Sequence, residues 1–336
     1  MSTSFSSNHN FSKGFFYVAD GTFNFYDTEK KTAYQDCYAS LNAGKTLGIG
    51  NYDSANIIHS NGKFYLLVGT STSNRDHFYI VDAKTLYYEN SAVVGANLSG
   101  LTILNEQYGL VTGDGIRRID LKSLNNVRIK NERLLCFYNS IIYNGKVLSN
   151  DTYKDESKVK YYDVNELIAA KEGEAPAVTE LDIIQKQKIN FVLAKDGNVY
   201  TLESADNGCN IVKIKNDFTL EKVFANFQPA KGPYHSSPTI GMVASETENI
   251  IYLVSTDGAI FKYILGDSDS LKAPFIAAES GVSITAPLQL NQQSGELYVT
   301  YTEERKDESK IVVYSKDGKV LHTVDCGAVS YTHLTL

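Results

Sequence analysis

Tryptophan is absent from this chain of 336 residues, and methionine, cysteine and proline are scarce, with two, four and six residues. Because no indole ring is available, a glycan-binding platform built on tryptophan stacking is disfavoured. The cysteines are widely separated and match neither a zinc motif nor a dense disulfide framework. We interpret them as isolated thiols, buried or half-buried, at Cys37, Cys136, Cys209 and Cys326.

Several other signals are missing. No apolar run reaches the roughly 18 residues that a membrane-spanning helix needs, so no transmembrane segment is predicted. The 32 Lys and Arg residues are scattered and the formal net charge is −7, which excludes the clustered basic face that nucleic acid binding requires. The six His residues occur singly, without metal-binding spacing, and neither a nucleophile elbow nor a phosphate-binding glycine loop is present. We therefore predict no metal and no cofactor.

What the sequence does contain is a repeated unit, clearest between Asn61 and Leu86. An Asn61-Gly62 pair is typical of a tight hairpin turn, because both residues tolerate positive φ. It is followed by strand-forming runs at 64–68 and 78–82, rich in Phe, Tyr, Val and Ile. The second run ends at Asp82, whose carboxylate can bond the backbone of the next turn.

This unit recurs seven times, with a mean spacing of roughly 47 residues, which suits a four-stranded propeller blade. The anchor positions are Tyr17, Tyr65, Val111, Val147, Tyr200, Tyr252 and Tyr298. The strand-ending aspartates recur as Asp27, Asp82, Asp120 and Asp163, and more loosely as Asp217, Asp267 and Asp317. We predict an all-β, seven-bladed β-propeller with four-stranded antiparallel blades, interrupted by one or two helical turns within 164–173.

The chain ends are predicted to lie outside this fold. Residues 1–13 are polar and lack an apolar signal-peptide core, so we expect a disordered segment. Either the protein is cytoplasmic or its natural leader is missing. Residues 329–336 look like a translated sequencing adapter and are predicted to be a non-native tail. A single propeller domain is expected over 14–328, with an incompletely closed last blade.

The order of several short motifs resembles the YncE-like surface propellers of Bacteroidota. The motifs are Asn24–Asp27, Lys45–Gly48, Asn61–Val68, Ser270–Ile276, Ser294–Thr300 and Ile311–Lys319, so the resemblance spans most of the chain. The family includes surface lipoproteins that capture cobalamin for a TonB-dependent outer-membrane receptor. The resemblance implies a protein on the extracellular face of the outer membrane or in the periplasm.

In a propeller, the loops between second and third strands and the links between blades share one face, which is the usual binding surface. Aromatic and basic side chains in these segments suit recognition of a polar ligand, although ordinary solvated loops have the same composition. The candidate ligand-binding residues are Tyr52, Arg75, His77, Tyr153, Tyr234, His235, Tyr301 and Arg305. No catalytic residue is predicted.

Two function classes stay open at this point. The favoured one is a noncatalytic binder that captures a small molecule, with a corrinoid as the candidate that the resemblance implies. The alternative is a lactonase-, lyase- or hydrolase-like propeller enzyme, because propeller active sites assemble from distant positions. A calcium loop at Asp267 and Asp269 is the less favoured interpretation of that segment, since calcium needs more oxygen ligands.

Overall fold

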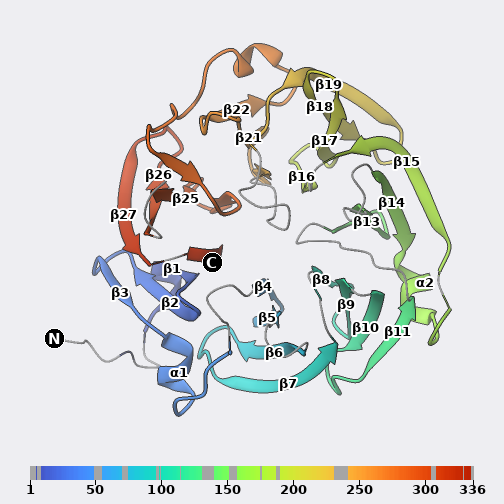
Figure 1. Ribbon diagram of the computed structural model, residues 1–336, viewed down its shortest axis with the longest axis vertical. Coiled ribbons are helices and arrows are strands. Elements are labelled where there is room, and N and C mark those ends of the chain that lie inside the picture. Colours follow the sequence, from blue (N-terminus) through green and yellow to red (C-terminus); the bar gives the residue numbers. More distant parts are fainter. Residues whose placement is uncertain are drawn as a thin grey trace. The chain divides into compact units, whose positions relative to one another are not determined.

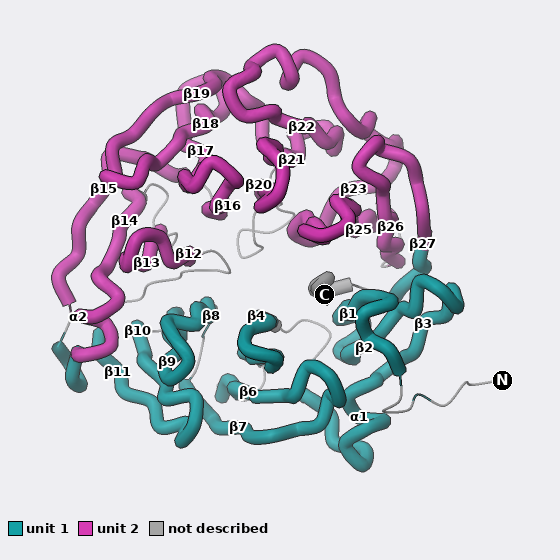
Figure 2. Tube along the Cα trace, turned by 180° about the vertical axis from the view of Figure 1, so that it is seen from behind, with its two compact units in different colours: residues 1–135, 170–175, 324–336 teal, residues 136–169, 176–323 magenta. Residues whose placement is uncertain are grey.

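The fold is a seven-bladed β-propeller built from antiparallel sheets, as the repeat predicts (Figure 1). The computed structural model describes residues 5, 9–48, 55–69, 75–95, 98, 100–113, 115–130, 140–150, 157–174, 176–186, 190–230, 241–303, 308–327 and 329–333. Its contacts separate two compact units (Figure 2). Unit 1 comprises residues 1–135, 170–175 and 324–336, and unit 2 comprises 136–169 and 176–323.

Unit 1 contains the first three sheets, each with four strands. The first has the order β28-β1-β2-β3, and its strands are β28 (Val329–His333), β1 (Gly14–Ala19), β2 (Thr22–Asp27) and β3 (Thr32–Tyr34). The second runs through β4 (Ala55–Ser60), β5 (Lys63–Val68), β6 (Asp76–Asp82) and β7 (Tyr88–Gly95). The third consists of β8 (Gly100–Ile103), β9 (Tyr108–Gly113), β10 (Gly115–Asp120) and β11 (Asn126–Lys130).

Unit 2 contains the other four sheets. The fourth sheet has β12 (Ile141–Tyr143), β13 (Lys146–Asn150), β14 (Ser157–Asp163) and β15 (Val178–Gln185). The fifth has β16 (Val192–Leu193), β17 (Val199–Ala205), β18 (Gly208–Ile214) and β19 (Leu220–Phe227). The sixth has β20 (Met242–Ala244), β21 (Ile250–Val254) and β22 (Ile260–Ile264). The seventh has β23 (Val282–Ile284), β24 (Gln289–Leu290), β25 (Leu297–Glu303), β26 (Ser309–Tyr314) and β27 (Val320–Cys326).

The sixth sheet departs from the predicted four strands. Where a fourth strand was expected, the chain forms the short 3-10 helix η2 (Ser268–Leu271), and the residues after it pair with β22 through an isolated bridge between Ile260 and Ile276. Pro274 lies in this segment and has no N–H to donate to a strand ladder. The outermost position of this blade is therefore an irregular segment.

The repeat itself is confirmed position by position. Every anchor lies in the second hairpin strand of its blade and is at most 4% exposed: Tyr17, Tyr65, Val111, Val147, Tyr200, Tyr252 and Tyr298. The hairpin turns also have the expected backbone, because φ is positive at both Asn61 and Gly62, and again at Asn144 and Gly145.

The repeated aspartates close the turns between third and fourth strands. Oδ1 of Asp82 accepts hydrogen bonds from the backbone N–H groups of Lys84 at 3.0 Å and Thr85 at 2.8 Å. Asp120 accepts equivalent bonds from Lys122 and Ser123. We call this end of each sheet the turn end. The opposite end, where the chain passes from second to third strand and from blade to blade, is the connector end.

Helices are few and short. The predicted helical turn is present as α2 (Val164–Ala169). A second helix, α1 (Cys37–Leu41), was not anticipated, because five residues are too short to show a helical period. Among the described residues, no helix is long and apolar enough to cross a membrane.

The N-terminal segment is more ordered than the sequence predicts. Phe11 belongs to the 3-10 helix η1 (Phe11–Lys13), is 7% exposed and packs in the core cluster of the first sheet. The His9 ring lies 4.6 Å from Phe5 and 4.5 Å from Tyr34, measured between centroids. The prediction of disorder over 1–13 is therefore wrong for these residues, because burial of their aromatic rings outweighs the polar composition.

The C-terminal segment also has a structural role. Residues 329–333, which the sequence assigns to a tail outside the fold, form β28 and pair with β1. The seventh sheet holds a full set of strands from β23 to β27. The expected defect in the last blade is thus not found, because the seventh sheet is complete and residues 329–333 pair with the first strand of the chain.

Candidate functional site

The predicted site residues fall into two groups. Five of the candidates lie outside the described residues: Tyr52, Tyr153, Tyr234, His235 and Arg305. The other three are Arg75, His77 and Tyr301, and the structure places them in different units, so each is considered in its own sheet.

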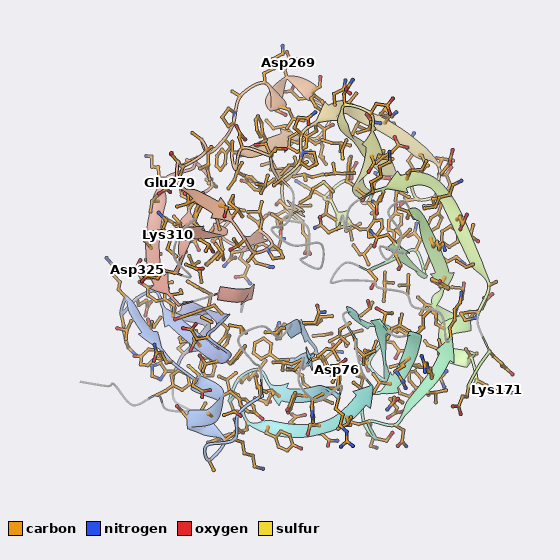
Figure 3. All side chains as sticks on the ribbon, viewed as in Figure 1. Asp76, Lys171, Asp269, Glu279, Lys310 and Asp325 are labelled. Atoms are coloured by element: carbon orange, nitrogen blue, oxygen red, sulfur yellow. The ribbon has the colours of Figure 1, made fainter. Side chains whose placement is uncertain are left out.

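Arg75 and His77 lie at the connector end of the second sheet. Arg75 is exposed and directly precedes β6. His77 is a strand residue, because β6 already begins at Asp76, so its predicted place in a loop is wrong. Asp76 is buried and accepts a hydrogen bond from the backbone N–H of Leu98, in the link to the third sheet (Figure 3). This bond ties the start of β6 to the following blade.

An aromatic surface extends from His77 along the same sheet. The His77 ring stacks on Tyr79 with centroids 5.9 Å apart and an angle of 23° between the planes. Burial, and then the neighbouring Tyr88, raise the pKa of Tyr79. The Tyr88 hydroxyl lies 3.2 Å from that of Ser91, and Lys45 Nζ lies 5.2 Å from the Tyr88 ring centroid. Stacking surface and cationic donors therefore occur together in unit 1.

Tyr301 lies in β25 of the seventh sheet and is only 3% exposed, so its predicted place in an open loop is also wrong. Its hydroxyl lies 3.1 Å from that of Tyr314, and burial followed by this contact raises the pKa of Tyr301. Lys310 Nζ lies 5.7 Å from the Tyr301 ring centroid and 2.8 Å from Glu279 Oε1 (Figure 3). The polar groups that solvent reaches here are thus Lys310 and Glu279.

Buried polar side chains gather at the connector ends of the strands. Those that lie toward this end are Asn24, Asn56, Asp76, Thr112, Ser149, Asn150, Gln185, Asn210 and Ser309. Asp27, Thr102 and Ser245 are buried toward the turn end, and Thr201 and Thr300 are buried near the middle of their strands. Ser255 is buried at the connector end, just after β21. Burying a polar group costs free energy unless it is hydrogen-bonded, so this distribution indicates a built layer rather than chance.

Unit 2 shows how the layer is connected. Asn150 donates to the Gln185 side-chain oxygen, and Gln185 Nε2 donates to Thr201 Oγ1 at 3.0 Å. Thr201 Oγ1 donates to the Asn190 carbonyl oxygen at 3.1 Å. The Asn190 side chain then bonds the backbone of Met242 in the sixth sheet. This chain of bonds passes through three consecutive sheets and was missed from the sequence, where isolated amides carry no periodic signal.

Metal-ligating side chains and thiols are dispersed among the described residues. The described residues contain no group of three or more His, Cys, Asp or Glu side chains placed to hold a metal ion. Cys37 and Cys209 are buried thiols, Cys326 is a half-buried thiol, and Cys136 lies outside the described residues. Burial raises the pKa of Cys209 to about 11, which leaves little thiolate at neutral pH.

The Asp267 to Asp269 segment is a helix cap. Asp267 Oδ1 accepts from the Asp269 N–H at 3.0 Å, and the Asp269 carboxylate pairs with Lys272 at 2.9 Å. The arrangement is what the N-terminus of η2 requires. The favoured interpretation of this segment as a turn thus accounts for both carboxylates.

Residues 11–328 match the family model described as a domain of unknown function, DUF5074. The chain belongs to this family. It is also similar to a quinonprotein alcohol dehydrogenase-like protein from Bacteroides thetaiotaomicron, with 97% identity, a TM-score of 0.93, and coverage of 97% of this chain and 79% of that one. The match shows the family; the narrower YncE-like and cobalamin-capturing expectations stay predictions.

More distant structures share only the fold. A functionally unknown protein from Desulfotomaculum acetoxidans is 12% identical with a TM-score of 0.57, over 94% of this chain and 99% of that chain. Hsv2 of Kluyveromyces lactis is 11% identical with a TM-score of 0.51, over 97% and 95%. No curated protein matches the sequence.

Proposed function

We propose that this DUF5074 chain is a noncatalytic ligand-binding propeller whose connector ends take up a small polar molecule. The observation that carries the proposal is the set of buried polar groups at those ends, exemplified by Asn150 and Gln185, which bond each other and reach Thr201 inside the next sheet. A hydrogen-bonded layer beneath the loops holds their anchor points rigidly, and rigid anchors lower the entropic cost of binding. The turn ends have a different character, because short aspartate-capped turns close them.

The exposed groups define the class of ligand. In unit 1, Arg75 supplies an exposed guanidinium just before β6, the strand that carries the stacked rings of His77 and Tyr79. Such groups suit a ligand with amide, carboxylate or phosphate oxygens and a flat surface. A corrinoid has this chemistry and is the first candidate. Tyr52, Tyr153, Tyr234, His235 and Arg305 remain predicted contributors.

A place at the cell surface follows from the same proposal. A capture protein of this kind acts on the extracellular face of the outer membrane or in the periplasm, and delivers its ligand to a TonB-dependent receptor. Copurification with such a receptor from a Bacteroidota host tests this partner, and a chain found only in the cytoplasm contradicts it.

Calorimetry against a panel of corrinoids tests ligand and site together. Truncation of a binding anchor typically costs about 2 kcal/mol or more, so Arg75→Ala and His77→Ala should each weaken binding at least tenfold. Lys84→Ala is the matched control, because Lys84 is also exposed and follows β6 at its turn end. If no corrinoid binds, the vitamin is the wrong ligand. If Arg75→Ala and Lys84→Ala lose the same affinity for the ligand, the connector end is excluded as the binding site.

A propeller enzyme is the second candidate, favoured by the quinonprotein alcohol dehydrogenase-like name of the Bacteroides thetaiotaomicron relative. A quinone cofactor that works with a metal ion needs a cluster of oxygen or nitrogen ligands, and the described residues hold no such group. They do not fit this cofactor. Reconstitution with pyrroloquinoline quinone tests the point, and quinone-dependent alcohol oxidation would replace the binding proposal.

A further inference from the structure

The first sheet is completed by a strand from the far end of the chain. β28 pairs with β1 alone, through Phe16 with His333, Val18 with Tyr331 and Ala19 with Val329, and the register shifts near Val18. The β1 residues from Phe15 to Ala19 are at most 4% exposed. Loss of β28 would therefore uncover a hydrophobic strand edge, which needs another strand to cover it.

The link that delivers β28 is short. β27 ends at Cys326 and β28 begins at Val329. The next shortest link between blades runs from the end of β7 at Gly95 to the start of β8 at Gly100, and the others are longer. The chain also passes very close to the first sheet, because a Cβ atom placed on Gly327 would lie 1.7 Å from Asp20 Oδ2. A short, tightly fitted hinge favours exchange of the strand between copies.

We propose that β28 is exchangeable, so that the β1 edge of one copy accepts β28 from a second copy of this chain. The exchanged dimer keeps every β28–β1 backbone bond and alters only the link between β27 and β28, at Gly327. Because the contacts are the same, the main free-energy cost of the dimer is the translational entropy lost on association, and high protein concentration offsets this cost. The partner for this surface is the protein itself.

The register supplies a matched pair of variants. Thr28 N donates to Lys13 O, so residues 15, 17 and 19 of β1 bond toward β2 and residues 16 and 18 bond toward β28. Tyr331, opposite Val18, therefore directs its N–H to β1, whereas Thr332, opposite Tyr17, directs its N–H away. Tyr331→Pro removes a pairing bond and Thr332→Pro does not.

The experiment measures the mass of the full chain by light scattering. Protein is incubated near its unfolding midpoint at high concentration and then cooled. A dimer that increases with concentration, persists in Thr332→Pro and falls at least tenfold in Tyr331→Pro is the expected result. A chain that stays monomeric throughout, or a dimer equally strong in Tyr331→Pro, overturns the proposal.

A cross-linking measurement gives an independent answer. One variant carries Ala19→Cys and another carries Val329→Cys, and both also carry Cys326→Ser. The two proteins are mixed, incubated near the unfolding midpoint, cooled and oxidised. Exchange predicts a covalent heterodimer that appears in the mixture and in neither variant alone. Both substitutions in one chain provide the geometric control: an intrachain cross-link without any heterodimer in the mixture shows that β28 stays with its own copy.

Discussion

Asn190 bonds both backbone groups of Met242: its Oδ1 accepts from the Met242 N–H at 2.8 Å, and its Nδ2 donates to the Met242 carbonyl oxygen. The side-chain amide thus makes the two hydrogen bonds to Met242 that the backbone of a neighbouring strand would otherwise make, and it links the fifth and sixth sheets. Asn42 makes the same kind of pair with Tyr88 N and Leu86 O, at 2.7 and 2.9 Å. Neighbouring sheets are joined by carboxamides as well as by apolar packing.

Asn190→Ala should lower the free energy of unfolding by about 2 kcal/mol, because the N–H and carbonyl of buried Met242 lose their partner. Urea denaturation measures the change. Asn198→Ala is the control, since Asn198 is half-buried in a turn, bonds only locally to the Asp196 carbonyl oxygen, and should shift stability by less than Asn190→Ala does. Equal effects in the two variants would show that the amide link contributes nothing.

Tyr252→Phe should flatten the loss of stability at alkaline pH. Burial raises the pKa of Tyr252 from 10.0 to about 12, so above pH 10 the unfolded chain loses this proton before the folded chain does. Stability is therefore full below pH 10 and falls as pH rises toward 12, by about 1.4 kcal/mol per pH unit for one proton. Unfolding curves of both proteins between pH 9 and 12 measure this; identical slopes would contradict the shift.

Asp120→Asn should have its main effect near neutral pH and little effect in acid. The Ser123 backbone N–H, which donates to the carboxylate, lowers the pKa of Asp120, so its stabilising contribution is complete above the unfolded value and disappears as pH falls through the folded value. Asparagine keeps an acceptor oxygen and does not titrate. The variant should be less stable than the parent near neutral pH and show a shallower decline below about pH 4, so that the two proteins converge in acid. Melting temperatures measured against pH test this prediction. If the variant and the parent lose stability equally steeply in acid, Asp120 does not make the predicted contribution.

Phe11→Ala should destabilise the first sheet by about 3 kcal/mol, the usual cost of removing a buried phenylalanine. Its neighbour Ser12 is exposed, and Ser12→Ala should change the unfolding free energy by no more than about 0.5 kcal/mol. The unfolding free energies of both variants, measured by guanidinium denaturation, show whether the N-terminal segment is packed or loose. Similar stability in the two would restore the prediction of disorder.

The sequence predicts the parts of the fold that repeat. Tyr65, Tyr252 and their counterparts are found because a buried strand needs the same kind of residue in every blade, and Asp82 and Asp120 because every turn needs a cap. The pairing of β28 with β1 joins opposite ends of the chain and leaves no local pattern. The missing strand of the sixth sheet depends on a single proline-containing segment.

The candidate site was predicted less well. Loop length, counted from anchor to aspartate, does not reveal that β6 already begins at Asp76 or that β25 continues past Tyr301. His77 and Tyr301 are consequently strand residues. The amide chain through Gln185 and Asn190 joins side chains to backbone groups far away in sequence, and composition gives no indication of such bonds.

Amide hydrogen exchange of the full chain, with and without saturating cyanocobalamin, tests the central claim most directly. Binding at the connector ends predicts slower exchange around Arg75 to Tyr79 and at Leu98, while the turn from Asp82 to Leu86 exchanges as before. Protection confined to turns of the Asp82 and Asp120 type, or no protection anywhere in the chain, would contradict the account.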